Sequence, residues 1–171
     1  MVPFENWIAQ HRALVKETLY SLGNNTRPQP AFIEELLTQP KSSTIMVIED
    51  RADERLLIQR TLSKQFPDAL ILLLPDATQA LAYLDAAVWF QQRLPGMILL
   101  DLYLPNAEAG FRLLKAIRNH HRFSTVPVIT ISRSSHVDDI TGVFRCGGNA
   151  YLVKPDDYLD WAEAFTILNH Y

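Results

Sequence analysis

The stretch that decides the fold is Met97-Ile98-Leu99-Leu100-Asp101, four apolar residues that end on a carboxylate. Three other short runs end in the same way, each on polar residues of its own kind: Ile45–Ile48 before Glu49-Asp50, Val128–Ile131 before Ser132, and Tyr151–Val153 before Lys154. Short apolar runs separated by helical stretches are typical of parallel strands buried on both faces. The sequence therefore predicts a parallel sheet whose polar groups gather at one edge.

From residue 44 onward the pattern alternates between strands and helices, which indicates an α/β fold with a doubly wound, five-stranded parallel sheet. We expect strands at about 45–49, 69–74, 97–100, 126–131 and 150–153. In the flavodoxin-like strand order 2-1-3-4-5, the first and third strands are neighbours at the point where ligands bind. Asp50 and Asp101, at the tips of those strands, would then face one another.

The helices are predicted from apolar spacing and from residues that favour helix ends. In the helix over about 52–65, we expect Leu56, Leu57, Ile58 and Leu62 to face inward. A long helix is expected from a cap at Asp76 or Thr78 up to a break at Pro95-Gly96, and the next helix should carry Phe111, Leu113, Leu114 and Ile117. The last two helices are expected from Ser134 or Ser135 to Gly147-Gly148 and onward from about 156.

The composition limits the class of protein. A chain of 171 residues with 48% hydrophobic residues is long enough for one full core, and its net charge of −3 gives no reason to expect nucleic-acid binding. Cys146, the single cysteine, excludes a disulfide within the chain and fits a reducing compartment. No run approaches the ~20 apolar residues that cross a bilayer. We therefore expect a cytoplasmic protein that contacts no membrane.

Residues 1–43 differ from the rest and predict a helical N-terminal extension, so the expected domains are 1–43 and 44–171. An apolar stripe from Phe4 to Leu22 follows helical spacing, and a second short helix should precede Pro40. The stripe could dock on the chain's own larger domain, pair two copies into a homodimer, or bind a partner helix. The sequence leaves these three alternatives open.

The side chains at the strand ends suit phosphoryl transfer. Glu49, Asp50 and Asp101 would repel one another without a cation, and together they form an oxygen site suited to Mg²⁺. Lys154 adds a positive charge and Ser132 a hydroxyl donor. A carboxylate in such surroundings can accept a phosphoryl group as an acyl phosphate.

Residues 44–171 resemble the receiver domain of two-component response regulators. The similarity rests on four motifs in family order: the acidic pair Glu49-Asp50, the acceptor motif Asp101–Pro105 with Gly110 behind it, Pro127–Ser132, and Tyr151–Pro155. The long second helix and the tail that carries Trp161 resemble receivers associated with bacterial phytochromes. The chain ends with the last receiver helix, so the expectation is a single-domain regulator.

The resemblance implies a signalling protein, not an enzyme. Asp101 would accept the phosphoryl group of a sensor histidine kinase or a phosphotransfer protein. Glu49, Asp50, Asp101 and the backbone carbonyl of Tyr103 would hold Mg²⁺, and Lys154 would pair with the acceptor. Ser132 would then bind a phosphoryl oxygen and Tyr151 would turn inward. This movement would bias the last two helices and the strand between them toward a downstream protein that the sequence does not identify.

Three departures from the family pattern bear on the site. The loop of residues 106–109 carries one extra residue, and Arg133 follows Ser132 where the family normally has alanine. That arginine would either crowd the phosphoryl pocket or add a counter-charge to it. Tyr103 lies two positions after the acceptor, where side chains influence the access of water, and it predicts slow hydrolysis.

The main alternative is a pseudo-receiver, a constitutive interaction module that is not phosphorylated. An aspartate-nucleophile phosphatase of the haloacid-dehalogenase type is disfavoured because Tyr103 stands where those enzymes have a second aspartate. A dinucleotide-binding domain is disfavoured because no glycine-rich loop follows the first strand.

Overall fold

The computed structural model describes residues 43–89, 94–157 and 159–171, so residues 1–42 of the expected extension lie outside it. Its centre is a parallel sheet in the order β2-β1-β3-β4-β5, which confirms the predicted flavodoxin-like topology. The strands are β1 (Thr44–Ile48), β2 (Leu70–Leu74), β3 (Met97–Asp101), β4 (Val128–Ser132) and β5 (Ala150–Val153).

The register of the sheet brings the carboxyl ends of the strands together. Ile48 of β1 lies beside Leu74 of β2 and beside Leu100 of β3. On the other side of β3, Asp101 pairs with Ile131, and Ser132 of β4 pairs with Val153 of β5. The polar residues that follow these positions therefore emerge at one edge of the sheet.

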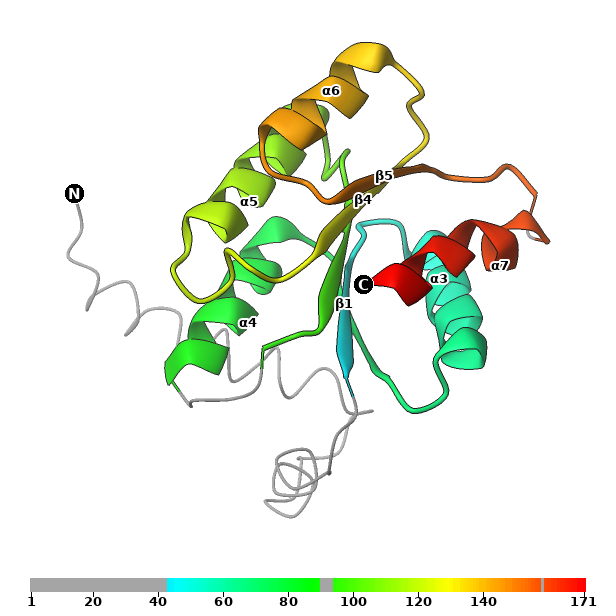
Figure 1. Ribbon diagram of the computed structural model, residues 1–171, viewed down its shortest axis with the longest axis horizontal. Coiled ribbons are helices and arrows are strands. Elements are labelled where there is room, and N and C mark those ends of the chain that lie inside the picture. The colour runs from blue at the N-terminus through cyan, green and yellow to red at the C-terminus, as the bar shows by residue number, and fades with distance from the viewer. Residues whose placement is uncertain (1–42, 90–93, 158) are drawn as a thin grey trace.

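Helices cover both faces of the sheet (Figure 1). On one face lie α4 (Ala77–Trp89), α5 (Ala107–Asn119) and α6 (Val137–Arg145). On the other lie α3 (Ala52–Gln65), α7 (Asp160–Ala164) and the 3₁₀ helix η1 (Phe165–His170). Among the described residues, no helix combines the length and the apolar character that a membrane crossing demands.

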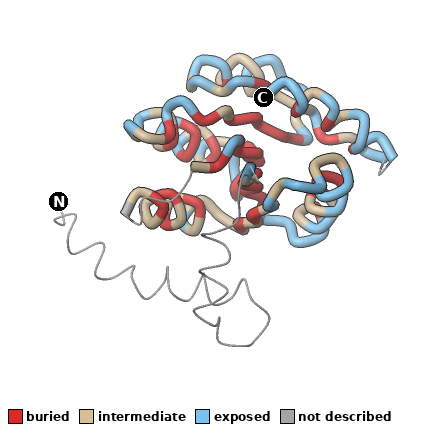
Figure 2. The backbone as a smooth tube through the Cα atoms, turned by 60° about the horizontal axis from the view of Figure 1, so that its bottom comes forward, coloured by how far each residue is buried: buried red, intermediate tan, exposed pale blue. Residues whose placement is uncertain are grey.

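Alternate residues of each strand pack into two separate hydrophobic cores, because successive side chains of a strand point to opposite faces of the sheet. Met46 and Ile48 pack with residues of α4, α5 and α6, whereas Ile45 and Val47 pack with residues of α3, α7 and η1. Figure 2 shows the buried segments in the middle of the molecule and the exposed ones along the outer helix faces. Full burial of each such side chain contributes roughly 1.5–3 kcal/mol.

The helix boundaries confirm some expectations and correct others. Helix α3 has the predicted bounds, but Leu56 is exposed, and the buried positions are Glu54, Ile58, Thr61 and Leu62. The Asp76 carboxylate accepts a hydrogen bond of 2.8 Å from the Gln79 amide, which confirms the cap of α4. Gly147, with φ of 89°, ends α6 as predicted.

Two helices begin later than expected. The backbone is still extended at His136, and α6 starts at Val137 because the Ser134 hydroxyl bonds to Asp139 and to the His136 amide. The last helix starts at Asp160 instead of about 156. Asp157 instead forms a local turn by accepting a hydrogen bond of 2.9 Å from the Leu159 amide.

Candidate phosphoryl-acceptor site

The structure brings Glu49, Asp50 and Asp101 together at the carboxyl end of the sheet. One carboxylate oxygen from each lies within 4.8 Å of the others. Glu49 and Asp101 are buried, whereas Asp50 is exposed. Adjacent strands β1 and β3 place the two aspartates next to each other, as the strand order predicts. Three oxygen donors with one exposed member form a pocket that suits a hard divalent cation reached from solvent.

Lys154 reaches into this acidic pocket from the end of β5. Its Nζ lies 2.7 Å from Glu49 Oε2 and 2.8 Å from Asp101 Oδ2. The lysine side chain is 3% exposed, so these ion pairs are shielded from solvent. The backbone holds Lys154 in place, because its amide donates to the Ser132 carbonyl over 2.7 Å.

The buried charges shift the proton affinities of the pocket. Burial, together with the neighbouring Asp101 carboxylate, raises the pKa of Glu49 to about 7. Burial opposes the charge of Lys154, but the carboxylates of Asp101 and Glu49 outweigh it and raise the pKa of the ammonium. Lys154 is therefore a firmly charged cation beside the predicted acceptor.

Glu54, which the sequence reasoning missed, is a fourth carboxylate beside the pocket. It lies in the first turn of α3, its side chain is 4% exposed, and its Oε2 is 2.7 Å from Lys154 Nζ. The available signal was its spacing, because Glu54 lies on the same helix stripe as Ile58, Thr61 and Leu62.

Arg133 supplies a counter-charge and turns toward Glu54. Its Nη2 and Nε donate to Glu54 Oε1 over 2.7 and 3.1 Å. The guanidinium remains about half exposed, with 54% of the side chain accessible. Of the two alternatives for this residue, the structure favours charge compensation over crowding.

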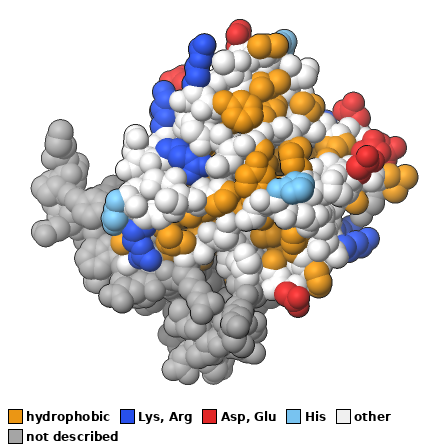
Figure 3. Space-filling model, in the orientation of Figure 1, with side chains coloured by type: hydrophobic (Ala, Val, Ile, Leu, Met, Phe, Trp, Pro, Cys, Tyr) orange, Lys and Arg blue, Asp and Glu red, His pale blue; other side chains and the backbone are white. Residues whose placement is uncertain are grey.

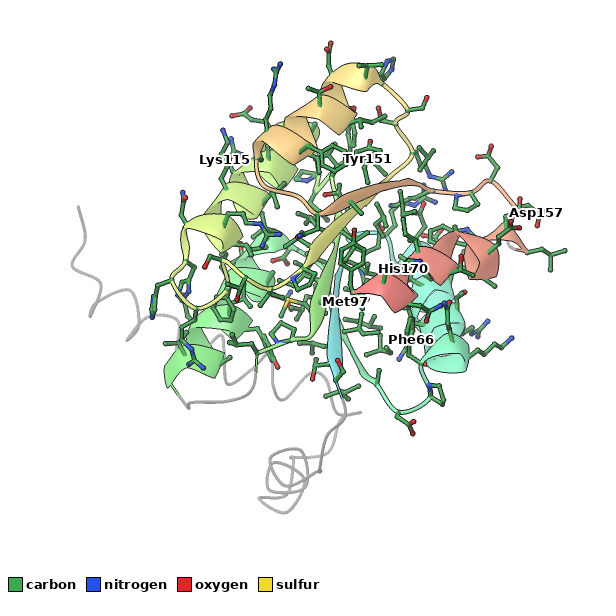
Figure 4. The ribbon with its side chains drawn as sticks, in the orientation of Figure 1. Phe66, Met97, Lys115, Tyr151, Asp157 and His170 are labelled. Atoms are coloured by element: carbon green, nitrogen blue, oxygen red, sulfur yellow. The ribbon has the colours of Figure 1, made fainter. Side chains whose placement is uncertain are left out.

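Ser132 and Tyr151 lie on neighbouring strands near the acceptor. Ser132 is fully buried, and its Oγ accepts a hydrogen bond of 3.2 Å from the Ser134 amide. Tyr151 of β5, labelled in Figure 4, donates its hydroxyl to the Ser134 carbonyl over 2.7 Å. Both predicted switch residues therefore contact the same segment, which leads from β4 into α6.

Tyr103 links the acceptor to α6. Its backbone amide donates to Asp101 Oδ1 over 3.1 Å, and its hydroxyl donates to Asp139 Oδ2 over 2.9 Å. The extra residue among 106–109 does not lengthen the loop before α5, because residues 107–109 already belong to the helix. Asn106 caps α5 by accepting a hydrogen bond from the Ala109 backbone amide.

The sequence matches the family described as response regulator receiver domain over residues 45–164. The chain belongs to this family. Among curated proteins, this receiver is 32% identical to the probable methanogenesis regulatory protein FilR2 of Methanothrix harundinacea over 116 residues, 68% of this chain and 74% of that protein. It is 28% identical to response regulator Rcp1 of Synechocystis sp. over 124 residues, 72% of this chain and 83% of that protein.

Solved structures of phytochrome and red-light response regulators have the same fold as this receiver. Response regulator RPA3017 of R. palustris, from red light signalling, is 29% identical with a TM-score of 0.66, covering 75% of this chain and 92% of that one. The phosphorylated cyanobacterial phytochrome response regulator RcpA is 27% identical with a TM-score of 0.64, covering 76% and 91%. The Mn²⁺-bound form of Rcp1 is 25% identical with a TM-score of 0.65, covering 75% and 93%.

Proposed function

We propose that this receiver takes a phosphoryl group onto Asp101 from the phosphohistidine of a sensor histidine kinase or of a phosphotransfer protein. The observation that carries the proposal is the Lys154 ammonium, 2.8 Å from the Asp101 carboxylate inside a buried acidic pocket. The similar structure of RcpA is that of a phosphorylated response regulator, which supports the reaction class. A histidine kinase takes its phosphoryl group from ATP, which is available in the cytoplasm. We therefore place this protein in the cytoplasm.

In the proposed reaction, an Asp101 carboxylate oxygen attacks phosphorus while the bond from phosphorus to the histidine nitrogen breaks. The imidazole leaves with the electron pair, and Asp101 becomes an acyl phosphate. Lys154 then donates a hydrogen bond to a phosphoryl oxygen, where the negative charge has moved. Ser132 gives up its local contact and donates its hydroxyl to a second phosphoryl oxygen.

The residues present fit a magnesium ion, because their donors are all oxygen and lie within 4.8 Å of one another. Asp50, Asp101 and the Tyr103 carbonyl would bind the ion, and Glu49 would do so directly or through water. When bound, Mg²⁺ neutralises charge that builds up on the transferring phosphoryl oxygens.

The output would be a change of protein contacts. Movement of Ser132 toward the phosphoryl group would break its bond to the Ser134 amide, and the Ser134 carbonyl also holds Tyr151. Figure 3 shows hydrophobic side chains gathered across the middle of this view and toward its top, where α6 lies. Phe144 of α6, Val153 of β5 and Leu159 just before α7 are exposed, and they offer a partner protein apolar side chains on these elements.

Phosphorylation can be tested with acetyl phosphate and Mg²⁺, scored by intact mass. We expect the wild-type protein to gain one phosphoryl group and an Asp101→Asn variant to gain none. An unchanged mass for both proteins would favour the alternative, a constitutive interaction module that is not phosphorylated. Beryllofluoride with Mg²⁺, followed by fluorescence, offers a second measure of the same site.

We also propose that residues 44–171 form the receiver and residues 1–43 a separate helical extension. The extension lies outside the described residues apart from Ser43. Sedimentation of the chain with and without residues 1–40 tests how its apolar stripe is used. An unchanged molecular mass with a lower melting temperature supports docking on the receiver, and a halved mass supports a homodimer.

A further inference from the structure

The Lys154 ammonium is surrounded by three carboxylates. Its Nζ lies 2.7 Å from Glu49, 2.7 Å from Glu54 and 2.8 Å from Asp101. An ammonium group has three N–H donors, so each donor serves one carboxylate. Loss of any one contact leaves the position of the ammonium group to the remaining two.

The three carboxylates would change differently during the proposed reaction. Asp101 loses the negative charge of its carboxylate when it becomes an acyl phosphate. Glu49 belongs to the cluster that would hold the cation. Glu54 lies outside that cluster and takes no part in the transfer. Its bond to Lys154 is therefore the contact that can persist from the free protein to the phosphorylated one.

Glu54 is itself held firmly. Arg133 donates twice to its Oε1, and Arg51 Nε approaches the same oxygen at 3.1 Å. These donors all hold the oxygen Oε1, which leaves the second oxygen, Oε2, to accept the bond from Lys154. Burial opposes the charge of Glu54, but hydrogen bonds from Lys154 and Arg133 outweigh it and lower its pKa.

We infer that Glu54, fixed by Arg133, is a positioning residue that holds the Lys154 ammonium beside the acceptor throughout phosphoryl transfer. This inference rests on the proposed function, because it assigns Glu54 a part in the same reaction. Neither residue touches the acceptor, so both act through Lys154.

The first test is Glu54→Gln. Glutamine has one acceptor oxygen and one NH₂ donor, so it cannot accept hydrogen bonds from both Lys154 and Arg133 on separate oxygens. The matched control is Glu108→Gln, because Glu108 forms an exposed ion pair with Arg112 on α5. The phosphorylation rate is measured over a range of acetyl phosphate concentrations with saturating Mg²⁺. We expect the maximal rate of Glu54→Gln to fall about tenfold, since small misplacements of a reacting group are costly. KM should change less than twofold, and Glu54→Asp should recover part of the rate.

The second test asks whether Arg133 acts through Glu54. Arg133→Ala should slow phosphorylation less than Glu54→Gln, because Arg51 still contacts Glu54. In the Glu54→Gln background, Arg133→Ala should have little further effect, which is the signature of a coupled pair. Arg112→Ala is the control for loss of an exposed arginine. Arg133 is half exposed, so its variant tests the inference even if Glu54→Gln does not fold.

The outcomes separate the inference from the function on which it rests. A wild-type protein that gains no phosphoryl group, like Asp101→Asn, overturns the proposed function and with it this role of Glu54. If the wild-type protein is phosphorylated and Glu54→Gln reaches the same maximal rate, the inference alone is wrong. Equal effects of Arg133→Ala in both backgrounds would likewise overturn the claim that Arg133 acts through Glu54.

Discussion

Tyr103 contacts the predicted acceptor through its backbone and helix α6 through its side chain. The hydroxyl bond to Asp139 holds the ring beside the pocket, although 41% of the residue is exposed. In the proposed phosphoprotein, an attacking water would approach the phosphoryl group past this region, and a phenol whose hydroxyl proton is donated to Asp139 would be a poor group for orienting that water.

We therefore expect Tyr103→Asn to shorten the half-life of the phosphorylated protein on the order of tenfold, because the amide can position a water molecule. The half-life is followed by intact mass after removal of the phosphodonor. Tyr171→Asn, at another partly exposed tyrosine, serves as the control. The idea fails if the wild-type phosphoprotein decays as fast as the Tyr103→Asn protein.

At the same scale, the strand-end residues could be predicted, whereas the spacing of Glu54 could indicate its burial but not its contact with Lys154. Asp101 and Lys154 follow apolar runs, so the strand order alone brings them to one edge. Glu54 is one of several charged residues in a helix start, and its direction depends on how α3 packs on the sheet. The direction of Arg133 depends in turn on Glu54, so the sequence left its two alternatives open.

At the scale of elements, α5 packs against the end of β3 through a glycine. A Cβ added to Gly110 would lie 2.0 Å from the Leu102 carbonyl oxygen. That oxygen belongs to backbone beside the acceptor and cannot move aside without shifting Asp101. The close approach of helix and strand therefore requires glycine at this position.

We expect Gly110→Ala to lower the free energy of unfolding by about 1–3 kcal/mol, the usual cost of overpacking. Chemical denaturation measures the loss, and Lys115→Ala on the exposed side of the same helix is the control. Phosphorylation of the variant should also slow, because relief of the clash moves the acceptor. A Gly110→Ala protein as stable as the control would show that the helix can shift at no cost.

Element boundaries show where sequence reasoning stops. The strands and the start of α4 follow from local signals, and Asp76 caps α4 with its own side chain. The start of α6 depends instead on a network of tertiary hydrogen bonds. In it, the Asp139 carboxylate accepts hydrogen bonds from the hydroxyls of Ser134 and Tyr103. Ser134 looks like a helix cap in sequence, but its hydroxyl serves this network.

At the scale of the whole molecule, the acidic pocket would couple the proposed cation binding to stability. Glu49, Asp50 and Asp101 repel one another in the folded protein and separate on unfolding. A cation that binds only the folded state shifts the folding equilibrium by mass action, and at ten times its dissociation constant it contributes about 1.4 kcal/mol.

We therefore expect Mg²⁺ to raise the melting temperature by roughly 2–6 °C, measured by calorimetry against NaCl of equal ionic strength. Asp50→Asn should melt at or slightly above the metal-free wild-type temperature, because it removes a repelling charge, and it should lose most of the Mg²⁺ response. Glu108→Gln, which removes an exposed carboxylate outside the acidic cluster, should keep that response. If Mg²⁺ stabilised Asp50→Asn as much as the wild type, the cation would be acting elsewhere on the protein, and the acidic pocket would not be its site.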